Sequence, residues 1–216
     1  MSISQNIIKL EKSLPKGVRL IAVSKTKPKS QLLEAYHSGQ RSFGENKIQE
    51  MTEKWGQLPK DIDWHMIGHV QTNKVKYMAP FVHLIHAVDS FKLLREIQKQ
   101  AEKNERNIGC LIQIRIAKEE TKFGLPAHEL VKMIDLAEQL PNINIRGLMG
   151  MASFTSDENQ VRTEFKTLAA LYKETRTSSP ECKILSMGMS GDYQLAIEEG
   201  SNMIRVGSKI FGERNK

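Results

Sequence analysis

Residues 184–212 read ILSMGMSGDYQLAIEEGSNMIRVGSKIFG, and this stretch decides the fold. It holds two apolar runs, at residues 184–186 and 203–206, and each run passes into a polar loop that contains glycine. A stretch of helical period separates the runs, beginning near Ser190 and ending at Glu199. Short apolar runs that alternate with helical stretches are typical of β/α units around a parallel sheet.

The same alternation continues toward the N-terminus and gives eight candidate strands, at residues 20–23, 42–44, 64–67, 84–88, 111–114, 145–149, 184–186 and 203–206. Eight strands are the number that a closed β/α barrel requires. We therefore predict an α/β fold with a single domain over residues 1–216, a (β/α)8 barrel of the TIM type. An open doubly wound sheet is the alternative, because the pattern counts strands without showing closure.

Three of the helical stretches begin with capping signals. Ser90 is a favourable N-cap type in front of a periodic apolar stretch. Thr155 with Glu158, and Asn46 with Gln49, have the three-residue spacing of a capping box. We expect crossover helices to begin at these residues.

The composition is that of an ordinary globular protein: of the 216 residues, 39% are hydrophobic and 26% are charged. Residues 1–14 lack the apolar run of a signal peptide, and no later run is long enough for a membrane span. Cys110 and Cys182 lie far apart, without the spacing of a disulfide framework or a metal site. The sequence thus predicts a cytoplasmic protein with neither a metal nor a membrane partner.

The formal net charge is +7, which raises the question of an anionic partner. Lysine and arginine alternate with acidic residues along most of the chain, as on solvated helix faces. We therefore expect no nucleic-acid partner. A small phosphorylated ligand explains a modest basic excess equally well.

In a barrel of this type the functional face lies at the carboxyl ends of the strands, so the residues that follow each apolar run are the candidates. Lys25 directly follows the run at 20–23, and its amine is expected to point into the barrel mouth. An amine with restricted water and a cationic neighbour attacks an aldehyde readily. The alternative is that Lys25 opens a solvated basic patch with Lys27 and Lys29.

Two loops near the end of the chain suggest an anion site. Ser190 and Gly191 precede one helical stretch, and Gly207 and Ser208 begin the last one. Backbone N–H groups and hydroxyls at such points bind phosphate, and the loops after strands seven and eight are its recurring place in barrels. The alternative for Ser190 is a simple N-cap, a role that is compatible with phosphate binding.

Arg205 is a charged residue inside the apolar run at 203–206, so its guanidinium needs a partner. A cofactor ring nitrogen, a carboxylate of a ligand or an internal ion pair would serve. Asn46 and His69 also follow strands, but an N-cap role for Asn46 and a structural role for His69 are the simpler readings.

Several motifs together resemble a known family: IAVSKTKP at 21–28, FGENKI at 43–48, WHMIGHVQTNK at 64–74, KFGL at 122–125, GLMGM at 147–151, LSMGMSGD at 185–192 and RVGSKIFGER at 205–214. The sequence resembles the pyridoxal phosphate homeostasis proteins, and more distantly the amino-terminal barrel of alanine racemases. The match extends from about residue 20 to the end of the sequence. Asn202 and Ser208 depart from it, since threonine is more frequent at both places, but Ser208 keeps the hydroxyl.

The resemblance implies that pyridoxal 5′-phosphate (PLP) is held on Lys25 as an internal aldimine. It also implies the surroundings of the cofactor: Ser190, Gly207 and Ser208 at the phosphate, Arg205 at the pyridine nitrogen, and Asn46, His69 and Met149 close by. An arginine cannot give the ring nitrogen a proton at neutral pH, so the ring stays a weak electron sink.

The resemblance further implies storage, buffering or delivery of PLP rather than catalysis, with effects on amino-acid and keto-acid balance. Racemases of the related type take a second base from an additional domain, which we do not expect in this monomeric protein. PLP-dependent apo-enzymes are the possible partners. The alternative function is that of a weak racemase or lyase, with Lys25 and His69 as bases.

Overall fold

Eight parallel strands close into one barrel, in the order in which they occur in the chain. The computed structural model describes residues 2–119 and 123–213. The strands are β1 (Arg19–Val23), β2 (Ser42–Glu45), β3 (Asp63–Met66), β4 (Leu84–Val88), β5 (Ile108–Gln113), β6 (Ile143–Met149), β7 (Ile184–Ser186) and β8 (Met203–Val206). The predicted barrel is therefore confirmed, and the alternative of an open sheet is wrong.

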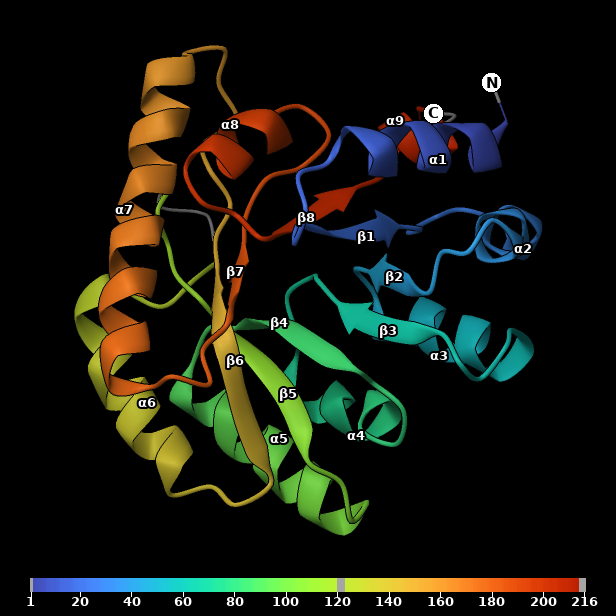
Figure 1. Cartoon of the computed structure of the whole chain (residues 1–216). Helices are drawn as coiled ribbons and strands as arrows, with labels where there is room; N and C mark the ends of the chain where they lie inside the picture. Colours follow the sequence, from blue (N-terminus) through green and yellow to red (C-terminus); the bar gives the residue numbers. More distant parts are fainter. Residues whose placement is uncertain (1, 120–122, 214–216) are drawn as a thin grey trace.

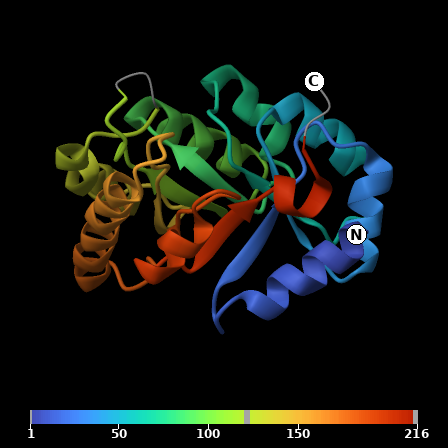
Figure 2. The same cartoon turned by 90° about the horizontal axis from the view of Figure 1, so that it is seen from above.

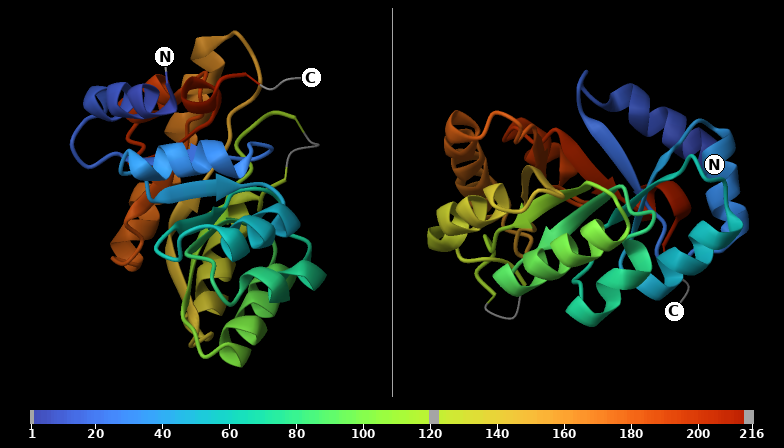
Figure 3. Two further views of the ribbon diagram at one scale, coloured as in Figure 1. Left: turned by 90° about the vertical axis from the view of Figure 1, so that its right-hand side faces the viewer. Right: turned by 90° about the horizontal axis from the view of Figure 1, so that it is seen from below.

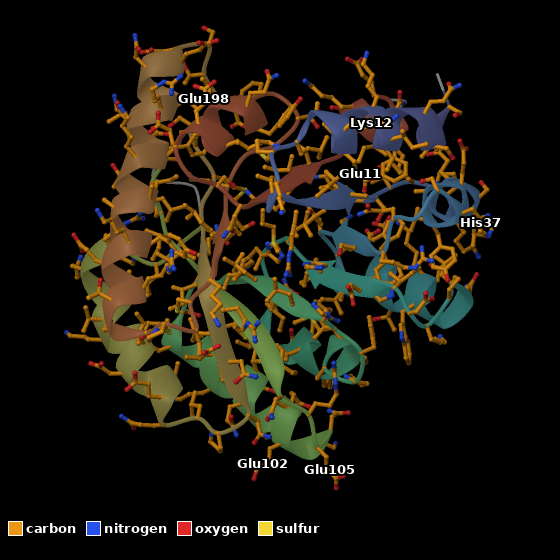
Figure 4. The ribbon with its side chains drawn as sticks, in the orientation of Figure 1. Glu11, Lys12, His37, Glu102, Glu105 and Glu198 are labelled. Atoms are coloured by element: carbon orange, nitrogen blue, oxygen red, sulfur yellow. The ribbon has the colours of Figure 1, made fainter. Side chains whose placement is uncertain are left out.

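Helices connect the strands and form an outer layer around them (Figures 1 and 2). The helices are α1 (Ile3–Ser13), α2 (Lys29–His37), α3 (Ile48–Gln57), α4 (Val75–Met78), α5 (Phe91–Lys103), α6 (Leu130–Glu138), α7 (Glu158–Ser178), α8 (Tyr193–Glu198) and α9 (Ser208–Phe211), with short 3₁₀ turns η1 (Thr72–Lys74) and η2 (Ala127–Glu129). All six residues labelled in Figure 4, among them Glu102 and Glu105 near the end of α5, are exposed.

Apolar side chains fill the structure on both sides of the strands, as expected for a sheet covered by helices on one face and closed on the other. The large cluster packs the strands against the helices and includes Phe43, Trp64 and Phe165. A smaller cluster lies inside the barrel and consists of Ile21, Leu84, Ala87, Leu111, Met149 and Met203. The barrel interior is thus a packed core with openings only toward its two ends.

The first and last elements complete the closure. β1 pairs with β8 over four residue pairs, and Figures 1 and 3 show α1 beside α9. The Asn6 side chain on α1 donates a hydrogen bond to the Ile210 carbonyl of α9, at 3.0 Å. β7 and β8 share only one residue pair, but the Asn202 side chain accepts from Leu185 N at 2.7 Å and donates to the Lys183 carbonyl at 2.7 Å. Asn202 therefore helps to hold β7 against β8.

The capping predictions have mixed outcomes. Ser90 is the N-cap of α5, and its hydroxyl accepts from Leu93 N, as predicted. Helix α7 begins later than predicted, because Asp157 rather than Thr155 accepts the first free N–H groups. Helix α3 also begins after the predicted cap: Lys47 stands at the N-cap position, without a side-chain cap.

Candidate functional site

A cavity of about 660 Å³ opens at the carboxyl ends of the strands. Its walls come from the residues that follow β1, β2, β3, β6, β7 and β8, together with the end of β5 and Phe123 in the loop after it. Seven of the eight predicted site residues line it: Lys25, Asn46, His69, Ser190, Arg205, Gly207 and Ser208. The fold thus brings together residues that are up to about 180 positions apart in the sequence.

Lys25 lies in the turn after β1, where it is half-buried and lines the cavity. Lys27 is held differently: its ammonium group donates to the carbonyls of Phe211, Gly212 and Glu213 at 3.1–3.2 Å. Lys29 is exposed at the start of α2. Lys25 and Lys27 thus line the same cavity, whereas Lys29 lies outside it.

The turn that carries Lys25 is fixed by a buried network of charges. The Lys54 ammonium group donates to the Ser24 carbonyl at 2.8 Å, and to Glu45 Oε1 and Glu50 Oε1 at 2.7 Å each. Ser24 Oγ donates to Glu45 Oε1 at 2.6 Å, and Thr26 N donates to Glu50 Oε1 at 2.6 Å. Hydrogen bonds thus hold Ser24 and Thr26, the residues on either side of Lys25, and they restrict the position of the Lys25 main chain.

The carboxyl group of Glu45 is fully buried, and this burial raises its pKa, while the Lys54 ammonium group and the Ser24 hydroxyl partly offset the rise. Glu45 Oε2 has no hydrogen-bond partner in the described residues. Glu45 therefore joins the network through Oε1, and its buried carboxylate depends on the charge of Lys54.

The loops after β7 and β8 meet at the cavity wall next to this turn, because β8 pairs with β1. Gly207 N donates to Ser190 Oγ at 3.2 Å, so the two loops are joined directly beside Ser208. Ser190 does not cap α8, because that helix begins at Tyr193 behind Asp192. The predicted N-cap role of Ser190 is therefore wrong. Its hydroxyl and the Ser208 hydroxyl both line the cavity, together with Gly191.

Arg205 reaches the cavity from β8 and is only 3% exposed. Its guanidinium donates to the Ser186 carbonyl at 2.9 Å, to Ser186 Oγ at 2.7 Å and to the Gly150 carbonyl at 3.0 Å. These acceptors are uncharged, so in the described part of the chain Arg205 forms no internal ion pair, and that alternative is wrong. Burial lowers the pKa of Arg205 to about 10, which still leaves the side chain cationic at neutral pH.

His69 lies at the side of the cavity between a carboxylate and an aromatic ring. Its Nδ1 is 2.9 Å from Asp89 Oδ2, and its ring stacks on Phe123 with the centroids 3.8 Å apart. The residue before it, Gly68, is packed so closely on the main chain of Asn46 that a Cβ there would lie 2.4 Å from the Asn46 carbonyl oxygen. This close approach holds the loops after β2 and β3 together at the cavity.

The structure does not bring Met149 to the cavity. Its side chain is fully buried in the cluster inside the barrel, and Met151, two residues later, lines the cavity instead. Among the lining residues that sequence reasoning missed are Gln113, Phe123 and Phe154. Gln113 carried a signal, because it is a polar residue inside an apolar run, like Arg205. Lys122 of the KFGL motif lies outside the described residues.

Two further searches bear on the kind of site. Over residues 2–119 and 123–213, no cluster of histidine, cysteine, aspartate or glutamate has the arrangement to hold a metal ion. In the same part of the chain no helix combines the length and the apolar character needed to cross a membrane.

Comparison with known proteins relates this geometry to a family. The sequence matches the alanine racemase N-terminal domain family over residues 1–215. It is 39% identical over 206 residues to a pyridoxal phosphate homeostasis protein of Vibrio alginolyticus, covering 93% of this chain and 88% of that protein. It is 40% identical over 211 residues to the human protein of that name, covering 91% and 77%.

A solved structure agrees with these matches. The structure of PipY of Synechococcus elongatus PCC7942 with PLP bound superposes with a TM-score of 0.90 at 34% identity, covering 98% of this chain and all of the other. The resemblance predicted from the motifs is confirmed. By the identity and the coverage of these relatives, the chain belongs to the family of pyridoxal phosphate homeostasis proteins.

Proposed function

We propose that this protein binds PLP in the cavity at the carboxyl ends of the strands, covalently on Lys25, and that it stores, buffers or delivers the cofactor. The carrying observation is the arrangement of the cavity: Lys25, in the turn after β1, lines the same cavity as the hydroxyl-bearing loops after β7 and β8 and the buried Arg205. The bound cofactor of the PipY structure supports the same ligand.

The residues fit the groups of PLP one by one. The Lys25 amine is suited to condense with the aldehyde, with loss of water. Ser190, Ser208 and the main chain at Gly207 offer hydroxyl and N–H donors for the phosphate. The Arg205 guanidinium is suited to the pyridine nitrogen, and the apolar side chains of Met151 and Met189 offer contacts for a flat ring.

The environment of Arg205 supports a carrier more than a catalyst. A bound PLP acts as an electron sink most strongly when its ring nitrogen is protonated. Arg205 stays cationic at neutral pH, with a pKa of about 10, and a cation facing the nitrogen disfavours a second positive charge there. We therefore infer that carbanion chemistry is weak at this site.

Reduction with borohydride tests the attachment. The wild-type chain, incubated with PLP and reduced, should carry the cofactor on the peptide that contains Lys25, as read by mass spectrometry. Lys25→Ala should lose the absorbance of the imine and the fixed label. Lys29→Ala is the matched control, because Lys29 is an exposed lysine four residues away that does not line the cavity. Equal labelling of the wild type and Lys25→Ala contradicts the proposal.

Delivery is a separate question from binding, and PLP-dependent apo-enzymes are its natural recipients. The PLP-loaded chain should reactivate a defined apo-enzyme held in a separate dialysis compartment more slowly than when the two proteins are mixed. Equal rates in both arrangements indicate a passive store that releases free PLP. The same preparation tests the proposed monomeric state by its sedimentation.

A reducing, cytoplasmic location is part of the proposal. Cys110 and Cys182 are both free and buried, and burial raises the pKa of the Cys110 thiol to about 12 and that of Cys182 to about 11. Such thiols are unreactive, and unpaired cysteines suit a reducing compartment. Fractionation of cells that express the tagged chain tests this location.

One observation favours a second function, a weak racemase or lyase. His69 lines the cavity, and the Asp89 carboxylate at 2.9 Å orients its ring, as for a general base. Exchange of the α-proton of small amino acids into deuterated water, lost in both Lys25→Ala and His69→Gln, would support this function. If the α-proton exchanges no faster than with free PLP in solution, only the carrier function is supported.

A further inference from the structure

A second cavity, of about 300 Å³, opens at the opposite end of the barrel, where the strands begin. It is lined by the first residues of β1, β2, β3, β4 and β8 and by their neighbours: Arg19, Ile21, Ser42, Asp63, His65, His83, Leu84, Arg106, Asn107, Gly109, Asn144, Arg146, Ile184 and Met203. The apolar members of this set belong to the cluster that fills the barrel. This cavity is therefore separate from the one that Lys25 lines.

Positive charge dominates the lining. Arg19, Arg106 and Arg146 come from three separate segments of the chain, and Asp63 is the one carboxylate that the described lining contains. Arg106 is fixed in place because its guanidinium donates to the carbonyls of Ala79 and Val82. The Asp63 carboxylate is 3.1 Å from His83 Nδ1. The arginines and the aspartate together leave about two positive charges at this end of the barrel.

Arg19 and Arg146 are available to a ligand. Within residues 2–119 and 123–213, neither guanidinium forms a hydrogen bond or an ion pair with another residue. Arg19 stands at the start of β1 and Arg146 lies on β6, so the barrel itself sets their separation. Both side chains are exposed toward the solvent side of the cavity.

A buried histidine supplies the second, independent observation. His65 is 3% exposed and lines this cavity, and its Nε2 has no hydrogen-bond partner in the described residues. Its other ring nitrogen, Nδ1, is 2.9 Å from His86 Nε2. Burial, with smaller contributions from His83 and Arg19, lowers the pKa of His65 to about 3, so the ring is neutral at physiological pH.

A hydrogen-bond chain behind His65 links it to Arg205. The Arg205 guanidinium donates to Ser186 Oγ at 2.7 Å, and His86 Nδ1 lies 3.2 Å from the same oxygen. When the Ser186 hydroxyl donates to His86 Nδ1, His86 carries its proton on Nε2 and donates to His65 Nδ1. His65 then carries its own proton on Nε2, a buried atom without a partner in the described residues, in a ring that lines the arginine-rich cavity.

We propose that this cavity is an anion site that binds the phosphate group of a small metabolite. The donors come from separate segments at one end of the barrel: the guanidinium groups of Arg19, Arg106 and Arg146, with the unpartnered Nε2 of the buried His65 ring in the same lining. A phosphate monoester carries between about 1.5 and 2 negative charges at neutral pH, which matches the charge of the lining. The amides of Asn107 and Asn144 complete a polar rim for the rest of the metabolite.

The test uses inorganic phosphate as the probe and the PLP-loaded chain as the protein, so that the loops at Ser190 and Gly207 are already engaged. Nitrogen-15 NMR follows the His65 ring, and titration calorimetry in a buffer without phosphate gives the affinity. Phosphate should move the His65 Nε2–H signal. Arg19→Gln combined with Arg146→Gln should weaken binding at least about tenfold, because the charge-assisted hydrogen bonds of both guanidinium groups to the phosphate are lost.

Arg95→Gln is the matched control, since Arg95 is an exposed arginine on α5 outside the cavity, and it should bind phosphate like the wild type. Both substituted arginines are exposed, so the double variant should fold, as its melting temperature will show. Unchanged affinity in the double variant, or absent phosphate binding to the wild type, overturns the proposal. Tighter binding of succinate than of phosphate overturns the assignment to phosphate.

The proposal does not rest on PLP binding at the other end. The same titration of the chain without PLP separates the anion site from the proposed PLP site. Phosphate that binds only at Ser190 and Gly207 leaves the His65 signal unmoved. A chain that fails to bind PLP but whose His65 signal still responds to phosphate refutes the proposed function and keeps this inference.

Discussion

At the scale of single residues, the position of Lys25 depends on charges that do not line the cavity. The Lys54 ammonium group contacts the Ser24 carbonyl and the carboxylate of Glu45, and all three groups are buried. Burial of a carboxylate is costly unless a cation compensates it. Lys54 therefore acts as a structural partner of the turn that carries Lys25.

Removal of the Lys54 ammonium group should strongly destabilise the folded chain. Lys54→Met keeps the length of the side chain but leaves Glu45 without its cation, so we expect the free energy of unfolding to fall by about 3–5 kcal/mol. Urea denaturation at neutral pH measures this change. Lys47→Met is the control, since Lys47 is an exposed residue at the start of the same helix, and it should lose little. A loss below about 1 kcal/mol in Lys54→Met would mean that Glu45 is protonated in the native state.

Sequence reasoning found the site residues that carry an unusual local signal. Lys25 and Ser190 follow apolar runs, and Arg205 interrupts one, so each stands out against the strand pattern. Phe123 and Phe154 gave no such signal, because they line the cavity from long loops rather than from strand ends. The hydrogen-bond partners of Arg205 could not be predicted from the sequence either, because Ser186 and Gly150 come close to it only when the barrel closes.

At the scale of elements, strand positions were easier to predict than helix starts. The predicted limits of β4, β7 and β8 are those of the structure, because each is a short apolar run between polar or glycine residues. β5 and β6 begin earlier than predicted, and in β6 the exposed polar residue Asn144 separates Ile143 from the predicted apolar run. The start of α3 was wrong because the Asn46 main chain is already committed to its close contact with Gly68.

Gly147 offers a test of how β6 and β7 fit together. Its φ angle is 150°, and a Cβ at this position would lie 1.8 Å from the carbonyl oxygen of Ile184, its partner on β7. Gly147→Ala should therefore force the two strands apart and reduce the free energy of unfolding by at least about 3 kcal/mol. Thermal unfolding followed by circular dichroism reads this loss.

Gly56→Ala is the matched control for Gly147→Ala, and it should raise stability rather than lower it. Gly56 lies inside α3 with open space around the position of a Cβ, so alanine should stabilise the chain by about 0.5–1 kcal/mol. Similar melting temperatures for the two variants would show that β6 can shift to accept a methyl group, against the close contact with Ile184.

At the scale of the whole molecule, one hydrogen-bond chain runs through the barrel from end to end. It passes from Arg205, at the cavity that Lys25 lines, through Ser186 and His86 to His65 at the opposite cavity. Both histidines lie inside a closed sheet, where water cannot solvate a charged ring. Burial accordingly lowers the pKa of His86 well below its usual range, and that of His65 to about 3. The barrel can keep this chain only while both rings are neutral.

This requirement should make the protein acid-sensitive. In the unfolded chain a histidine takes up a proton near pH 6.5, whereas His65 in the folded chain resists protonation down to about pH 3. The unfolded state therefore binds more protons in this interval, and stability is complete above about pH 6.5 and falls as the pH decreases toward 3. His65 alone accounts for about 1.4 kcal/mol for each pH unit in this range, and His86 acts in the same direction.

Urea unfolding at several values between pH 7 and pH 5 measures the slope of stability against pH. His65→Gln removes one titrating ring, so its mean slope between pH 7 and pH 5 should be shallower than that of the wild type by about 1 kcal/mol per pH unit, because the unfolded ring is only partly protonated in the upper half of this interval. His37→Gln is the control, because His37 is exposed on α2 (Figure 4), and it should keep the wild-type slope. If His65→Gln also keeps the wild-type slope, His65 is not a neutral buried ring. The assignment of a proton to its Nε2 is then wrong as well.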